Sequence, residues 1–160
     1  MSRADLLRAR RAHSVVKVQD DEFPDRLFYD MANQIWYEPF ADGAIRVGFT
    51  IWAVKLMGDV LVFTPKRVGR DFEKGRSFAV VEGGKWVGSA RAAFDGIVTA
   101  HNKALERKPE LLNQDAFGEG WMLMVRPARD NWRQDLVTGT AIAPAFDAWF
   151  SSEAYKDRAD

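Results

Sequence analysis

Short runs of apolar and β-branched residues alternate with turn-forming residues along most of the chain. Such runs, bounded by Gly, Pro, Asn or Asp, are typical of short β-strands joined by turns. The pattern predicts strands at residues 26–32, 35–41, 44–50, 59–65, 76–82, 85–92, 96–102 and 118–127. The first three are expected to form an antiparallel meander, with turns at Asn33-Gln34 and Asp42-Gly43. Because many short strands leave many edges, we expect a mostly β fold that is closed or sandwiched to hide them.

Two internal segments have helical character instead. Residues 50–58 form the clearer predicted helix, since Thr50 can cap its first turn and Gly58 can end it. Residues 104–112 favour helix as well, but Pro109 restricts their middle. These short helices are expected as additions to the β framework.

Length and composition indicate one domain at residues 24–160, preceded by a basic extension at residues 1–23. The chain has 160 residues, of which 47% are apolar, and this suits a single globular domain. Residues 66–75 are predicted to be a polar loop, and the tail from Asp130 is predicted to be helical. The apolar positions of this tail are Phe146, Trp149 and Phe150.

The N-terminal extension differs in charge from the rest of the chain. Its first seventeen residues carry one acidic side chain, Asp5, against the basic side chains Arg3, Arg8, Arg10, Arg11 and Lys17. We expect a short amphipathic helix or a basic arm here. A partner-docking segment or an organelle presequence is the alternative, because a basic arm can bind an acidic surface.

Composition excludes several classes of function. Lys and Arg together number 23, as do Asp and Glu, so no basic field indicates a nucleic-acid partner. No apolar run approaches the roughly 18 residues of a membrane span, so we expect no membrane partner. The chain has no cysteine and two distant histidines, His13 and His101, so a metal site is not expected. No motif for a catalytic nucleophile or a bound nucleotide is complete, which favours a carrier or binding protein over an enzyme.

A lysine at the top of a predicted hairpin is the most distinctive feature of the pattern. The strand ending in Glu82 is followed by Gly83, Gly84 and Lys85, and a second strand begins near Trp86. One interpretation is a solvent-facing turn, in which the glycine pair supplies the positive φ that a tight turn needs. The other is that Lys85 is presented to another protein.

The residues around this hairpin resemble a known family. The segment FAVVE at residues 78–82, the GDV that starts at Gly58 and the long segment HNKALERKPELLNQDAFGEGW at residues 101–121 match the glycine cleavage system H proteins in order and spacing. These are lipoyl carriers of the barrel-sandwich hybrid type. The resemblance implies that fold, with short helices and a helical C-terminus. It also implies (R)-lipoate attached to Lys85 as lipoyl-lysine. Biotin is disfavoured, because Lys85 has Gly84 and Trp86 beside it instead of methionines.

The flank EGGKWVG departs from the usual H-protein pattern, as does the basic extension. Both features resemble the lipoate-binding proteins of the heterodisulfide-reductase-like sulfur-oxidising system. That resemblance implies a cytoplasmic carrier of sulfur intermediates. Its partners would be the heterodisulfide-reductase-like complex, lipoate-attaching enzymes and dihydrolipoamide dehydrogenase. The alternatives are a glycine cleavage H protein that carries an aminomethyl group, and an unmodified scaffold or lipoate relay.

We expect the chain to act as a monomer. Trp86 is expected either to shield the arm or mark the surface for a partner, or to pack across the strand pair.

Overall fold

The computed structural model describes residues 14–152, which form eleven strands and several short helices. The strands are β1 (Val15–Val18), β2 (Asp21–Pro24), β3 (Phe28–Asp30), β4 (Ile35–Pro39), β5 (Ile45–Phe49), β6 (Val60–Pro65), β7 (Asp71–Phe72), β8 (Ser77–Gly83), β9 (Val87–Arg91), β10 (Gly96–His101) and β11 (Leu123–Pro127). The helices are α2 (Ile51–Met57), α3 (Lys103–Arg107), α4 (Leu111–Gln114), the 3-10 helix η1 (Gly139–Ala141) and α5 (Ile142–Phe150).

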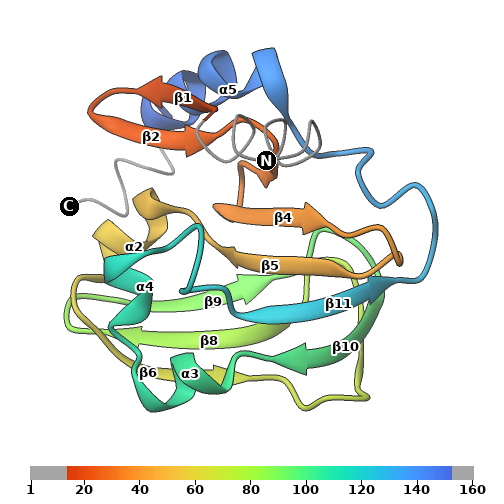
Figure 1. The fold of residues 1–160 in the computed structure, drawn as a ribbon. Coiled ribbons are helices and arrows are strands. Elements are labelled where there is room, and N and C mark those ends of the chain that lie inside the picture. The colour runs from red at the N-terminus through yellow and green to blue at the C-terminus, as the bar shows by residue number, and fades with distance from the viewer. Residues whose placement is uncertain (1–13, 153–160) are drawn as a thin grey trace, which may run out of the picture.

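Two antiparallel sheets enclose the main core (Figure 1). One sheet has six strands in the order β3-β4-β5-β11-β10-β7, and the other has three in the order β6-β8-β9. Val47, Val98 and Val125 of the larger sheet are buried in one cluster with Phe63 and Val81 of the smaller one. The predicted fold, mostly β with short helices and a helical C-terminus, is confirmed.

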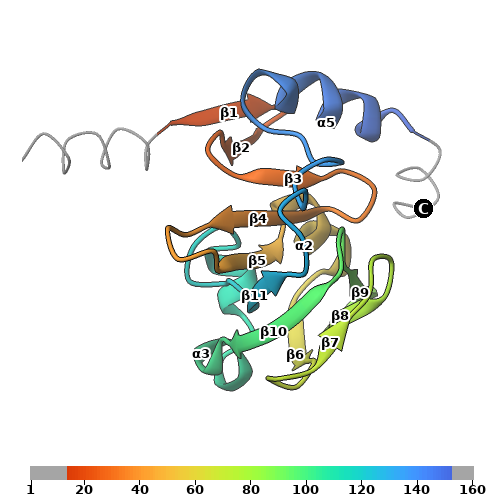
Figure 2. The same cartoon turned by 90° about the vertical axis from the view of Figure 1, so that its right-hand side faces the viewer.

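A second layer covers the outer side of the larger sheet. The β1–β2 hairpin and α5 lie together beyond β3 and β4 (Figure 2). Between them and the sheet is a separate aromatic core, whose fully buried members include Phe23, Tyr29, Trp36 and Phe146. Trp52 of α2 joins this core by stacking on Trp149 at a centroid distance of 5.6 Å. The chain therefore has two hydrophobic cores, one on each side of the six-stranded sheet.

Trp36 explains how β4 and β5 pack so closely. The two strands pair Trp36 with Gly48, and a Cβ added at Gly48 would lie 2.5 Å from the indole ring. The ring nitrogen of Trp36 donates a hydrogen bond to the carbonyl of Ala116 at 3.0 Å. A buried indole N–H needs such a partner, and this one ties the sheet to the loop after α4.

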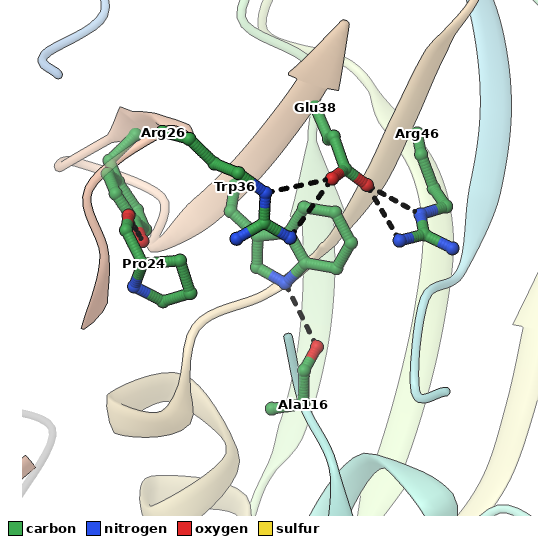
Figure 3. Close-up of polar contacts among 7 residues, drawn as sticks. Pro24, Arg26, Trp36, Glu38, Arg46 and Ala116 are labelled. Atoms are coloured by element: carbon green, nitrogen blue, oxygen red, sulfur yellow. Dashed lines mark hydrogen bonds and ion pairs between the residues drawn. The ribbon is translucent and has the colours of Figure 1, made fainter. Parts of the chain in front are cut away.

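Polar contacts also join β4 to its neighbours. Figure 3 shows Glu38 between two guanidinium groups, those of Arg26 and Arg46. Arg26 Nη2 and Arg46 Nη2 lie 3.1 Å and 2.7 Å from the two carboxylate oxygens. Because Glu38 is mostly shielded from solvent, these paired contacts are stronger than isolated surface ion pairs.

Most predicted elements are confirmed, including the three-strand meander and the helix at residues 50–58. The predicted polar loop at residues 66–75 is wrong at β7, where Phe72 is buried and pairs with Gly96 of β10. The helical segment at residues 104–112 is divided into α3 and α4 on either side of Pro109, as a residue without a backbone N–H requires.

The last predicted strand begins later than expected. β11 starts at Leu123, because the carbonyls of Glu119 and Trp121 accept hydrogen bonds from the side chain of Asn102. The tail is helical only from η1 onward. Before it, Val137 forms a β-bridge with Tyr29, so the predicted helix from Asp130 is wrong over that stretch.

The predicted N-terminal helix or arm lies mostly outside the described residues, which begin at Ser14. Residues 15–17 belong to strand β1, so a helix or free arm is wrong there. The β-branched residues Val15, Val16 and Val18 favour a strand, and Gln19 turns the chain into β2 with a φ of 55°. The division at residue 23 stays a prediction. None of the helices in residues 14–152 has the length and apolar character that a membrane crossing needs.

Candidate functional site

Lys85 lies at the tip of the hairpin that joins β8 to β9. The last residue pair of this hairpin is Glu82 with Val87, and the backbone N–H of Gly83 donates to the carbonyl of Trp86 at 3.0 Å. Lys85 is exposed to solvent, like its neighbours Gly84 and Trp86. The five residues singled out from the sequence, 82–86, thus form one tip, in which all but the half-buried Gly83 are exposed.

The backbone of the tip is fixed although its side chains are exposed. The N–H of Lys85 donates to the carbonyl of Met57 at 2.9 Å, and the N–H of Gly84 donates to that of Asp59 at 2.9 Å. Met57 is the last residue of α2, and Asp59 immediately precedes β6. Two consecutive amides of the tip are therefore anchored to one short connection between a helix and a strand.

Gly83 and Gly84 do not have the positive φ of the tight turn that was one interpretation of the sequence. That interpretation is wrong because the tip is not a two-residue turn. It is a longer connection held by the segment after α2. Gly83 is needed for a different reason, since a Cβ there would lie 2.2 Å from the carbonyl oxygen of Met57. At Gly84 the nearest atom to an added Cβ is the Asp59 carbonyl oxygen at 3.9 Å, an ordinary contact.

The glycine with the strained backbone is Gly58. It ends α2 with a φ of 77°, and its N–H donates to Val54 as the cap of the helix. A Cβ at Gly58 would lie 3.0 Å from Cγ of Lys85, so the aliphatic stem of the lysine lies against it. Gly58 thus both turns the chain and leaves room for the lysine.

Asn113 of α4 supports the same connection from the other side. Its Oδ1 accepts from the N–H of Val60 at 2.9 Å, and its Nδ2 donates to the carbonyl of Gly58 at 3.0 Å. From the sequence, Asn113 was only part of the 101–121 motif, and this contact was not predicted. The sequence shows only an asparagine after two leucines in a short helix. Nothing in that pattern indicates that its side chain binds residues more than fifty positions away.

A groove of about 240 Å³ lies next to the tip. It begins at Trp86 and Val87, follows β9 to Ser89 and Arg91, and has α2 on its other side. The remaining lining residues are Asn33, Gln34, Phe49, Ala53 and Leu56. The walls near the tip are mainly apolar, and polar groups lie farther along. Trp86 is therefore part of a groove wall next to Lys85.

Among residues 14–152, no group of three or more His, Cys, Asp or Glu side chains could hold a metal ion. The site is thus an exposed primary amine on a fixed backbone beside a groove. Its chemistry is that of a nucleophile to which an acyl group can be attached.

Comparisons with known proteins agree with this geometry. The family model described as glycine cleavage H-protein matches residues 27–147. Glycine cleavage system H protein 2 of Aquifex aeolicus is 36% identical over 80% of each chain. H protein 5 of the same organism is 40% identical over 65% of this chain and 72% of its own. The crystal structure of a glycine cleavage system H protein from Mycobacterium marinum superposes with a TM-score of 0.67 at 30% identity. It covers 76% of this chain and 97% of that one.

Proposed function

The chain belongs to the glycine cleavage H-protein family, and from this premise we propose that it is a lipoyl carrier with its arm on Lys85. Proteins of this family are non-catalytic carrier subunits that hold lipoate covalently on a lysine. The observation that carries the proposal is the hairpin tip itself. It combines an exposed amine with a backbone anchored at two consecutive amides.

The tip suits an attached arm for a mechanical reason. An arm that visits several enzymes needs a free distal end and a fixed base, and the two hydrogen bonds to Met57 and Asp59 supply the base. The amine of Lys85 must lose a proton before it attacks the carbonyl carbon of an activated lipoyl group, such as lipoyl adenylate. The C–N amide bond then forms, the C–O bond to AMP breaks, one of the two remaining amine protons passes to solvent, and the other stays as the amide N–H. A solvated surface lysine can undergo this change at low cost.

The groove beside the tip fits the attached group. It follows β9 from Val87 to Arg91, which is about 13 Å at about 3.3 Å per residue. Its apolar walls at Trp86, Val87 and Leu56 suit a hydrocarbon arm. When attached, the dithiolane supplies the redox-active sulfur that a chain without cysteine lacks. The residues of the chain present the arm, and the partner enzymes perform the reactions.

The cargo that the relatives' names favour is the aminomethyl group of glycine cleavage. We therefore place first a carrier that works in the cytoplasm with lipoate-attaching enzymes and dihydrolipoamide dehydrogenase within the glycine cleavage system. This reverses the order given by the sequence, where sulfur oxidation came first.

Sulfur transfer stays the second candidate, and two observations favour it. The lysine has a large aromatic neighbour, Trp86, in the sequence EGGKWVG. The Aquifex relatives carry the numbers 2 and 5, so one organism has several H-like proteins that need not share a cargo. In this case the partner would be a heterodisulfide-reductase-like complex.

Intact-mass analysis tests the attachment. The chain is incubated with lipoate, ATP and a lipoate–protein ligase, and peptide mapping locates the added mass. We expect one lipoyl group on Lys85, none on Lys85→Arg, and normal loading of the control Lys103→Arg, which changes another exposed lysine. Lys85→Arg should change the free energy of unfolding by less than about 0.5 kcal/mol. Loading of Lys85→Arg would place the arm on another lysine and contradict the assignment to Lys85. An unloaded wild-type chain would leave only the scaffold or relay interpretation.

A second assay separates the two cargoes. The lipoylated chain is added to purified glycine cleavage enzymes, and turnover is compared with that of an authentic H protein. Comparable turnover supports the first candidate. Negligible turnover, together with loss of sulfur-substrate oxidation in a strain lacking this gene, would favour the second.

A further inference from the structure

Exposed apolar side chains gather around Lys85. We call Leu61, Val62, Trp86 and Val87 the tip patch; their exposed fractions are 60%, 43%, 39% and 55%. Only three other large apolar side chains are exposed within residues 14–152, namely Val15, Phe40 and Val68. Scattered apolar side chains on a surface are ordinary, but a group of four at one place indicates a binding surface.

The strand register explains why these side chains share a face. Val62 of β6, Glu82 of β8 and Val87 of β9 are paired in one row across the three-stranded sheet. A bulge between Val60 and Val62 adds Leu61 as an extra exposed residue beside this row. Apolar side chains therefore flank a central carboxylate in the last row paired across all three strands before the tip that carries the lysine.

We propose that the tip patch, together with Glu82, is the docking surface for the enzyme that attaches lipoate to Lys85. This inference rests on the proposed function. The partner it fits has an apolar contact area and a basic side chain opposite Glu82. The carboxylate of Asp59 is also exposed beside the tip, so the same charge preference extends along the rim.

The position of the reacting amine selects this partner over others. The amine of Lys85 ends a four-carbon stem, and the base of this stem lies against Gly58. The backbone N–H of Lys85 is held by the carbonyl of Met57. An enzyme that forms a bond to this amine must bring its activated acyl group down to the tip, and so must cover the patch. Enzymes that act on the sulfur end of the arm meet it at a distance from the tip and need not touch β6.

The carboxylate of Glu82 beside the tip patch is expected to orient the partner as it binds. Opposite charges across an interface mainly steer encounter and orient the partner, and salt weakens them. Apolar anchors near the centre of an interface contribute most of the binding energy. We therefore expect apolar and charged substitutions to differ in salt dependence.

The first test removes apolar contacts without changing the shape of the strands. Val62→Thr and Val87→Thr are combined in one variant, since threonine keeps the β-branched form. Transfer from preformed lipoyl adenylate by a lipoate–protein ligase is followed as a function of carrier concentration. The KM for the carrier should rise about tenfold, with kcat changed less than about twofold. Val68→Thr is the control, because Val68 is 52% exposed but lies away from the tip.

The second test addresses the carboxylate. Glu82→Gln should raise the KM about threefold or more at low salt, and the difference from wild type should disappear at high salt. The control is Glu73→Gln, which removes another exposed carboxylate outside the tip. Circular dichroism and thermal melting of every variant should match the wild type, so that altered kinetics are not an effect of unfolding.

The outcomes separate this inference from the function on which it rests. A wild-type chain that accepts no lipoyl group on Lys85 contradicts the proposed function. A chain that is loaded at Lys85, but whose patch variants have the KM of Val68→Thr, overturns the docking surface alone. Slower reoxidation by dihydrolipoamide dehydrogenase with unchanged attachment would assign the patch to that enzyme. If the patch variants had a lower mass than the wild type by light scattering, the tip patch would be assigned to contact with a second copy of the chain. Either result overturns the proposal.

Discussion

Three glycines near Lys85 look alike in the sequence but have different functions. Gly58 adopts a positive φ of 77° that other residues rarely adopt. Gly83 has no such φ, but its missing side chain admits the Met57 carbonyl. Gly84 shows neither constraint. The sequence indicated a hairpin with glycines before a lysine, and only one of the two, Gly83, is required by its surroundings. The sequence could not identify the reason, because close approach depends on α2, which lies elsewhere in the chain.

Because the two glycines differ in this way, alanine should lower the free energy of unfolding at Gly83 but leave it nearly unchanged at Gly84. Gly83→Ala places a methyl group against a backbone carbonyl, so α2 or β8 must shift. We expect a loss of about 1–3 kcal/mol in the free energy of unfolding, as for an overpacked site. Lipoylation should slow as well, because the displaced carbonyl anchors Lys85. Gly84→Ala should stay within about 0.5 kcal/mol of wild type. Denaturant unfolding and a mass-spectrometric time course measure both effects. Equal behaviour of the two variants would contradict the close approach at Gly83.

At the scale of elements, the sequence predicted those helices and strands whose ends are set by residues next to them in the chain. α2 begins and ends where Thr50 and Gly58 indicated, and Thr50 Oγ1 accepts from the N–H of Ala53 at 3.3 Å. β7 was missed because a strand of two residues is too short to show an alternation of apolar and polar positions. It is recognisable only from its pairing with β10. β1 was missed because its valines follow a strongly basic stretch, which favoured an arm.

The tip depends on a contact between elements that no local pattern encodes. α4 reaches the segment after α2 through Asn113, and that segment anchors the lysine-bearing hairpin. The two hydrogen bonds of the Asn113 side chain therefore stabilise the base of the proposed arm indirectly. Asn113 is a positioning residue, since it does not touch Lys85 itself.

Asn113→Ala tests this connection. We expect a loss of about 1 kcal/mol in stability, at the lower end for two hydrogen bonds, because Asn113 is solvent-exposed and water can replace it in part. The more specific result is faster hydrogen exchange at the amides of Gly84 and Lys85, because the segment that accepts from them loses its support. Asn131→Ala is the control, since the side chain of Asn131 donates to the exposed side chain of Gln134, away from the tip. Unchanged exchange at Lys85 would show that α4 does not stabilise the tip.

At the scale of the whole molecule, two cores share one sheet and one helix. α2 contributes Val54 and Met57 to the main core and Trp52 to the aromatic core. Asp21 of the hairpin, which precedes the family match, accepts from Trp52 Nε1 at 2.8 Å and from Lys55 Nζ at 2.6 Å. The β1–β2 hairpin, which lies outside the match, therefore contacts the helix whose last residue anchors Lys85. The sequence predicted the fold class but not this second core, because its aromatic residues come from segments far apart in the chain.

Each core contains a buried tyrosine, and together they make the molecule sensitive to alkali. Burial raises the pKa of Tyr37 in the main core and of Tyr29 in the aromatic core far above the ordinary value near 10. Above pH of about 10 the unfolded chain releases these protons and the folded chain does not. The stability that is fully present below pH 10 is therefore lost as the pH rises. Two such groups give a slope approaching about 2.7 kcal/mol per pH unit.

Unfolding in denaturant at pH 8 to 11, with tyrosinate absorbance recorded in parallel, checks this slope. Ionisation of Tyr29 and Tyr37 should coincide with unfolding, and Tyr37→Phe should remove about half of the slope while losing the hydrogen bond from the N–H of Ala93. Lys74, whose pKa is raised by its hydrogen bond to Asp135, acts in the same direction but is exposed and contributes little. Tyr155 is the third tyrosine of the chain, and Tyr155→Phe removes its contribution from the absorbance measurement. If both buried tyrosines ionised near pH 10 while near-ultraviolet circular dichroism stayed native, the two cores would admit water more readily than their packing indicates.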